Sequence, residues 1–116
     1  MRYACGVIVR VVLIKLKPKF QSYGQRRLIA KKTLDVLPNA ARVMNVTVNI
    51  ASDPRTEREW DICILVRFAS LQDPDVYRID PVHRAFADVF LKPMMDKIHV
   101  YHYEEYQPDK SMAPAR

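Results

Sequence analysis

The sequence predicts an α+β domain whose elements follow one another as β-α-β-β-α-β, the ferredoxin-like arrangement of two helices against a four-stranded antiparallel sheet. Three observations lead to this fold class. Four segments have the composition or alternation of strands, and two longer segments between them have helical spacing. At 116 residues, the chain has the length of one domain with a core of its own.

The first half of the chain predicts a strand, a helix and a second strand. Residues 7–17 are β-branched and apolar on both faces except at Arg10 and a lysine-rich end, and Pro18 ends them. Residues 20–37 predict a helix, and residues 43–50 alternate between apolar and polar side chains as a strand does. The expected apolar stripe of the helix, interrupted by Arg27, consists of Phe20, Tyr23, Ala30, Leu34 and Leu37.

The second half predicts the remaining elements. Residues 52–58 form a polar loop, residues 60–68 a strand with Trp60 on its apolar face, and residues 71–79 a short helical segment. Asp80-Pro81 is a strong helix start, an N-cap acceptor followed by the residue best tolerated at the first helical position, and this helix runs towards Pro93. Residues 98–106 form the last strand.

The domain is expected to span residues 7–106, between an extension at 1–6 and a disordered tail at 107–116 rich in polar residues and proline. No apolar run approaches the ~20 residues of a membrane-spanning helix. Arg10 and Lys15 interrupt the apolar N-terminal run, which lacks the cleavage site of a signal peptide. We therefore expect a cytoplasmic protein with no membrane partner.

The net charge of +6 is concentrated near the start, where nine basic residues precede the first acidic one, Asp35. No aromatic residues interleave them as a nucleic-acid stacking platform needs, so we favour a solvated surface over a nucleic-acid partner. The two cysteines, Cys5 and Cys63, predict free thiols and no disulfide.

The strands at 7–17 and 60–68 are apolar on both sides, yet two helices cover only one face of the sheet. Something outside the chain must bury the other face. A second copy of the same sheet is the simplest solution, because identical chains meet through self-complementary patches. The sequence therefore predicts a homodimer whose sheets face each other as an α/β barrel.

One place in the chain suggests chemistry. The helix from Pro81 carries an apolar stripe, and His83 lies in its first turn, six residues after Tyr77. The stripe comprises Val82, Ala85, Phe86, Val89 and Phe90. An imidazole and a phenol at one helix entrance could act as a general base and a hydrogen-bond donor to a substrate carbonyl, or could simply hold the helix entrance in place.

Four segments resemble the stress-responsive A/B barrel (Dabb) family, in which most members have no known activity. Val-Val-Leu-Ile-Lys-Leu-Lys (11–17) is similar to V-V-L-F-K-x-K, and residues 60–68 are similar to Y-D-x-A-L-V-x-x-F. Tyr77 to His83 with Phe86 resembles Y-x-x-H-P-x-H-x-x-F, and Val100 to Tyr103 resembles V-V-D-Y. The resemblance implies a dimeric ferredoxin-like barrel over roughly residues 7–106.

A plant polyketide cyclase of this family uses the motif's tyrosine and second histidine in a cofactor-independent aldol condensation. The resemblance thus implies catalytic roles for Tyr77 and His83 in a cyclase or lyase acting on a small, mostly apolar, carbonyl-containing ligand. Two motif positions differ: the first histidine is Asp80 here, and the closing aspartate is His102. The alternative is therefore a non-catalytic stress-response protein whose motif residues are structural.

Further residues are candidates for ligand binding. Arg10 shares a strand face with Ile8, Val12 and Ile14, from which it could pair with a ligand carboxylate. Phe86, Phe90 and Tyr103 are candidates for the cavity lining. No metal is expected, because His99 and His102 are three residues apart on a strand and so point to opposite faces. The family resemblance implies no cofactor.

Overall fold

The computed structural model describes residues 6–108, so the predicted extension at 1–6 and tail at 107–116 lie almost wholly outside the described residues. The four strands are β1 (Ile8–Leu16), β2 (Asn45–Ile50), β3 (Ile62–Phe68) and β4 (Met95–Glu104). The helices are α1 (Tyr23–Val36), α2 (Pro54–Glu59), α3 (Asp73–Ile79) and α4 (Pro81–Ala85). Short 3₁₀ turns at Pro18–Phe20, Leu37–Asn39 and Lys92–Met94 join them, and a π-helix at Phe86–Leu91 continues α4.

The strands form one antiparallel sheet in the order β2-β3-β1-β4, with β1 and β3 at its centre. The register places Arg10 of β1 opposite Val66 of β3 and His102 of β4. This topology confirms the predicted ferredoxin-like α+β fold, because β1 and β3 are central and antiparallel and the last strand returns to the edge beside β1.

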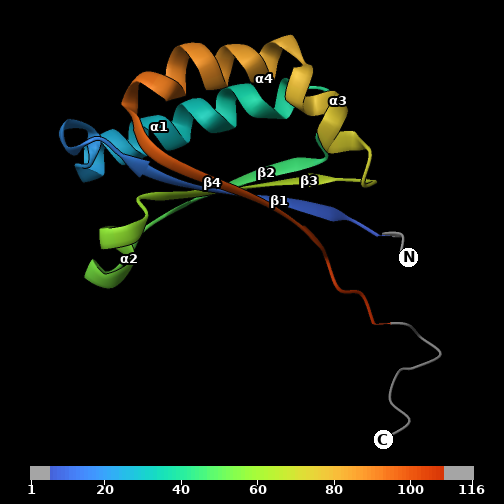
Figure 1. Cartoon of the computed structure of the whole chain (residues 1–116), viewed down its shortest axis with the longest axis horizontal. Coiled ribbons are helices and arrows are strands. Elements are labelled where there is room, and N and C mark those ends of the chain that lie inside the picture. The colour runs from blue at the N-terminus through green and yellow to red at the C-terminus, as the bar shows by residue number, and fades with distance from the viewer. Residues whose placement is uncertain (1–5, 109–116) are drawn as a thin grey trace, which may run out of the picture.

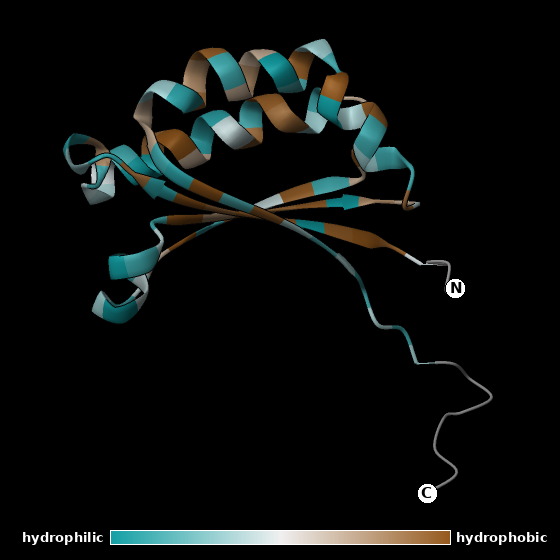
Figure 2. Cartoon of the chain, in the orientation of Figure 1, coloured by the Kyte–Doolittle hydropathy of each residue, from teal (hydrophilic) through white to brown (hydrophobic). Residues whose placement is uncertain are grey.

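Helices α1, α3 and α4 lie in one layer over one face of the sheet, with α1 and α4 side by side, whereas α2 lies apart from them at one end of the sheet (Figure 1). Alternate residues of β1 and β3 are buried, since their side chains point at the helices. The largest fully buried side chains come from the strands, from Ile29 of α1 and from Tyr77 of α3. The core therefore sits between the helical layer and the two central strands, which supply most of the buried apolar side chains. Both strands are largely hydrophobic in Figure 2.

The buried face of α1 differs from the predicted apolar stripe. Arg26, Ile29 and Thr33 are buried, whereas Tyr23 and Leu34, two members of the expected stripe, are 61% and 46% exposed. The helix is turned because the Arg26 guanidinium pairs with the fully buried carboxylate of Asp61, and this ion pair fixes which face meets the sheet. The spacing of apolar residues in the helix does not show that Arg26 lies on the buried face.

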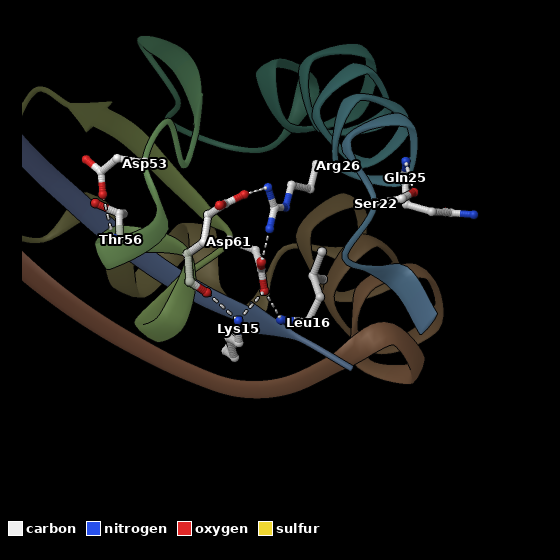
Figure 3. Close-up of polar contacts among 9 residues, drawn as sticks. Lys15, Leu16, Ser22, Gln25, Arg26, Asp53, Thr56 and Asp61 are labelled. Atoms are coloured by element: carbon white, nitrogen blue, oxygen red, sulfur yellow. Dashed lines mark hydrogen bonds and ion pairs between the residues drawn. The ribbon is translucent and has the colours of Figure 1, made fainter. Parts of the chain in front are cut away.

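Asp61 is the centre of a buried polar network at one end of the sheet (Figure 3). Its Oδ1 accepts a hydrogen bond of 2.7 Å from Arg26 Nη2, and its Oδ2 accepts one of 2.8 Å from the Leu16 backbone N–H. Lys15 Nζ lies 3.4 Å from the same Oδ2, and Glu57 of α2 accepts a bond of 2.5 Å from Arg26 Nη1. The network joins α1, β1, α2 and the start of β3.

Three other predictions need correction. The polar loop expected at 52–58 contains α2, because Asp53 caps it by accepting a hydrogen bond from the Thr56 N–H and Pro54 suits its first turn. Trp60 therefore follows a helix and is not part of β3. The last strand begins at Met95, three residues earlier than expected.

The helix starting at Pro81 also differs from its predicted stripe. Asp80 does cap it, since its Oδ2 accepts a bond of 3.0 Å from the Val82 N–H. His83, Phe86 and Leu91 are buried, but Val89 is 75% exposed. The π-helical segment at Phe86–Leu91 shifts the helical register, so the strict three-and-four spacing does not continue through it.

The second face of the sheet is not covered by α1 or α4 (Figure 1). The register places a row of partly buried side chains there from the two central strands, comprising Val9, Val11, Leu13, Cys63 and Leu65. Beside them on β4 are His99, Tyr101 and Tyr103. This apolar, aromatic face is the surface that, as predicted from the sequence, a second copy of the chain would cover.

Candidate functional site

A small cavity of about 50 Å³ lies between the helical layer and the sheet. Its walls come from β1, β3, β4, α3, α4 and the turn after α1, and they are mostly apolar. Three polar side chains line it, those of Arg10, Tyr77 and His83. The structure thus brings together the two predicted catalytic residues and the predicted ligand-binding arginine, which are separated by up to 73 positions in the sequence.

The Tyr77 and His83 rings are in direct contact, with centroids 4.2 Å apart. Tyr77 lies at the cavity because α3 packs its ring edge-on against Phe68 of β3, with centroids 5.1 Å apart. His83 follows because α4 begins directly after α3 and Asp80 caps it. Both side chains are buried, with 2% of Tyr77 and 8% of His83 exposed.

The hydrogen bonding of His83 defines its tautomer. Its Nδ1 lies 3.1 Å from the backbone carbonyl oxygen of Arg78, which can only accept, so Nδ1 carries the hydrogen and donates it. Nε2 of the neutral ring is then a free acceptor, the form that a general base requires. The carbonyl of Arg78 orients the imidazole here, and no carboxylate of the described residues is hydrogen-bonded to it.

The electrostatics keep both rings neutral near pH 7. Burial lowers the pKa of His83, the hydrogen bond to the Arg78 carbonyl raises it, and the charges of Arg10 and Arg84 lower it further. Burial also raises the pKa of Tyr77 to about 12, against the lowering effect of Arg10. The site therefore holds an unprotonated imidazole beside a protonated phenol, a base next to a hydrogen-bond donor.

Arg10 completes the polar wall. It is 8% exposed, and its guanidinium carbon lies 5.5 Å from the centroid of the Tyr77 ring. Its Nη1 donates a hydrogen bond of 3.1 Å to Nε2 of His102 on the neighbouring strand. His102 must present a lone pair to make this bond, in keeping with burial and the Arg10 charge, which lower its pKa.

Sequence reasoning did not find His102 as a partner of Arg10. The antiparallel register of β1 and β4 places the two residues opposite each other, and that register could have been counted from the strand ends. In the resemblance to the family, His102 is only the position at which the pattern has an aspartate. In this chain a neutral imidazole contacts Arg10 at that position.

Of the other predicted ligand-binding residues, one lies at the cavity and two lie elsewhere. Phe86 lines the cavity, as expected. Phe90 contacts the Phe86 ring at a tilt, with centroids 5.5 Å apart, but faces a separate groove on the helical side with Lys32 and Val36. Tyr103 is 60% exposed on the uncovered sheet face, so the structure does not bring it to the cavity.

The part of the chain from residue 6 to 108 contains no group of three or more histidine, cysteine, aspartate and glutamate side chains that could hold a metal. Within the same residues, no helix is long and apolar enough to cross a membrane.

Two helices against one face of an antiparallel sheet, with a phenol, an imidazole and a guanidinium in the cavity between them, define a ferredoxin-like α+β protein with an interior site. The family model of the stress responsive A/B barrel domain (Dabb) matches residues 8–105. The chain therefore belongs to the Dabb family. No curated protein matches its sequence.

Solved structures show the same fold. A Dabb family protein with a ferredoxin-like fold from Mesorhizobium loti is 20% identical, with a TM-score of 0.71 over 88% of this chain and 99% of that one. A dimeric protein of unknown function from Bacteroides fragilis is also 20% identical, with a TM-score of 0.68 over 89% of this chain and 100% of that one. The hydroxynitrile lyase of Passiflora edulis is 18% identical, with a TM-score of 0.71 over 90% and 98%.

Proposed function

We propose that this Dabb-family protein is a cofactor-independent acid–base catalyst, a cyclase or lyase that acts on a small, mostly apolar, carbonyl-containing ligand. The observation that carries the proposal is the pair of contacting rings of Tyr77 and His83, buried in the cavity with Nε2 of His83 left as a free acceptor. Support for the reaction class comes from the similarity in fold to a hydroxynitrile lyase.

The proposed reaction needs only these groups. Nε2 of His83 takes a proton from the carbon beside a carbonyl, while the Tyr77 hydroxyl donates a hydrogen bond to the carbonyl oxygen that gains charge. The electron pair of the enolate then forms a C–C bond to a second carbonyl carbon, and the new alkoxide takes back the proton from His83. In the reverse direction, the same steps cleave a β-hydroxy carbonyl compound.

The size of the cavity limits what enters it. Typical ligand pockets enclose about 300–1,000 Å³, and this one encloses about 50 Å³. It therefore takes the reacting group of a ligand, while the remainder occupies the opening of the cavity or space made by side-chain movement. A compact substrate fits this site better than a long polyketide chain does.

The proposed assembly is a homodimer in which the uncovered sheet faces meet as an α/β barrel. The row of apolar side chains on that face supports it, as does the dimeric state of the Bacteroides fragilis protein of similar fold. Analytical ultracentrifugation at micromolar concentration is expected to show a dimer. A stable monomer at that concentration would contradict the proposed homodimer. We also propose a cytoplasmic location.

A second function is a non-catalytic role in a stress response, with the motif residues holding the fold. The hydrogen bond from His83 to the Arg78 carbonyl favours it, because that contact alone would fix the entrance of α4. The small volume of the cavity favours it as well. In this case His83→Ala lowers the melting temperature and no carbonyl compound is turned over.

Exchange of α-protons separates the two functions. The protein is incubated with 2-butanone in D₂O, and deuterium incorporation is followed by NMR; cleavage of acetone cyanohydrin is measured in parallel. The proposal predicts turnover that falls about 100-fold or more in His83→Ala. It also predicts a fall in Tyr77→Phe, which keeps the packing of the ring. Turnover that is absent in the wild type, or unchanged in both folded variants, contradicts the catalytic proposal.

A further inference from the structure

The cavity contains a buried positive charge that the described residues do not neutralise. We propose that the ligand of this site carries a carboxylate, and that Arg10 binds this group inside the cavity. The inference rests on the proposed function in that both place the ligand in the same cavity. It concerns binding alone, however, and holds whether or not the ligand is then transformed.

The contacts of Arg10 show why its charge is uncompensated. Its hydrogen-bond partner is the neutral ring of His102, and its other close neighbour is the face of Tyr77. Among residues 6–108, no carboxylate lies within ion-pair distance of it, and its buried Nε has no hydrogen-bond partner. A buried guanidinium normally has an anionic partner, because the desolvation of a lone charge is strongly unfavourable.

The surroundings add positive charge and little that offsets it. Burial and the nearby charge of Arg78 both lower the pKa of Arg10, which means that they disfavour its charged form. An ionised Tyr77 would raise that pKa, but the Tyr77 phenol stays protonated near pH 7 because its own pKa is raised to about 12. The charge of Arg10 lowers the pKa of both His83 and His102, so neither histidine offsets it. An anion in the cavity would be attracted by Arg10 and could also accept hydrogen bonds from the Tyr77 hydroxyl.

The remaining walls select a small head group with an apolar body. Val12, Ile64, Val66, Leu91 and Ile98 supply the apolar lining. A cavity of about 150 Å³ holds benzene, which has six heavy atoms, so the volume of about 50 Å³ here has room for two or three heavy atoms. A planar carboxylate has three, and a guanidinium matches it with two parallel hydrogen bonds.

Histidine NMR gives a test with an internal control. The chain has three histidines, of which His83 and His102 contact the site. His99 lies on the opposite sheet face, bonded to Tyr101. Sodium formate, acetate and butyrate are titrated into the protein, with sodium chloride at equal ionic strength and the neutral acetamide and butyramide as controls. The proposal predicts saturable shifts of the His83 and His102 ring signals with the carboxylates only, and an unmoved His99 signal.

Two variants and a matched control assign the binding to Arg10. Arg10→Met removes the charge and keeps an apolar chain, whereas Arg10→Lys keeps the charge and loses the planar fork. Arg58→Gln removes one exposed positive charge from α2. The proposal predicts carboxylate binding about 10- to 100-fold weaker in Arg10→Met, intermediate in Arg10→Lys and unchanged in Arg58→Gln.

Several results would overturn the inference. Shifts that chloride or the amides reproduce would show that no carboxylate is recognised, and equal binding by wild type and Arg10→Met would show that Arg10 does not bind it. The absence of saturable binding of any carboxylate by the folded wild-type protein would refute it directly. If neutral ketones are turned over while carboxylates do not bind, the proposed function stands and this inference fails.

Discussion

Arg26 and Arg10 are two arginines of nearly equal burial, 6% and 8% exposed, in very different surroundings. Arg26 donates to the carboxylates of Asp61 and Glu57. Arg10 contacts a neutral histidine and an aromatic face. Both keep a buried Nε without a hydrogen-bond partner among the described residues, so the difference lies in the counter-charges alone.

The comparison separates a charge that the chain neutralises itself from one that, as we propose, a ligand neutralises. Arg26 belongs to a network that the chain completes by itself, so it ties α1, α2 and β3 together. Arg10 faces a cavity, where the missing counter-charge can come from a ligand. A buried arginine without a carboxylate partner from its own chain therefore indicates a binding site. Substitution of Arg26 and of Arg10 should accordingly change the stability of the fold in different ways.

The largest effect is expected at the structural arginine. Arg26→Met leaves the fully buried carboxylate of Asp61 with only Lys15 and a backbone N–H as partners. Breaking a buried ion pair from one side typically costs about 3–5 kcal/mol. Urea unfolding is expected to show a loss of this size. If the loss is below about 1 kcal/mol, the network contributes no more than an exposed ion pair.

Arg10 is expected to respond in the opposite direction. Arg10→Met removes a desolvated charge at the cost of a cation–π contact with Tyr77 and a bond to His102. The variant should unfold at the same or a higher urea concentration, with a gain of up to about 2 kcal/mol. A destabilisation as large as that of Arg26→Met would mean that Arg10 is structural and the comparison is wrong.

Acid should weaken the protein through the site histidines. The pKa of His83 is lowered from 6.5 in the folded state, chiefly by burial, and that of His102 is lowered in the same way. As the pH falls below 6.5, the unfolded chain binds protons first, so stability is full above this pH and decreases below it.

Unfolding free energies at about pH 7.5 and about pH 5.5 measure this loss. Arg10→Met is the informative variant, because removal of its charge lets the pKa of both histidines rise towards the ordinary value. The acid-induced loss should therefore be smaller in Arg10→Met than in the wild type. An equal loss in the two proteins would place its origin elsewhere in the chain.

The smallest effect is expected at an exposed ion pair. Lys31 and Asp35 lie one helical turn apart on α1, with side chains 76% and 58% exposed and atoms 2.9 Å apart. Lys31→Ala should change the unfolding free energy by no more than about 0.5 kcal/mol. A larger change would show that charge pairs in this protein are not ranked by burial.

The sequence predicted the ferredoxin-like succession β-α-β-β-α-β and the helix entrance with Tyr77 and His83, since strand alternation and the Asp80-Pro81 cap are local signals. It did not predict the face that α1 buries, because the Arg26–Asp61 pair joins residues 35 positions apart. The contact of Arg10 with His102 spans 92 positions and depends on strand register. The π-helical segment at Phe86–Leu91 likewise has no signal in a pattern that assumes constant helical spacing.

The most direct test of the account is the stabilisation of the protein by acetate. Unfolding free energies of the wild type and Arg10→Met are measured in sodium acetate and in sodium chloride at equal ionic strength. A ligand that binds only the folded state stabilises it by an amount that grows with concentration. We expect acetate to stabilise the wild type and to leave Arg10→Met unchanged. Equal stabilisation of both proteins, or of neither, would contradict the assignment of Arg10 as the carboxylate-binding group.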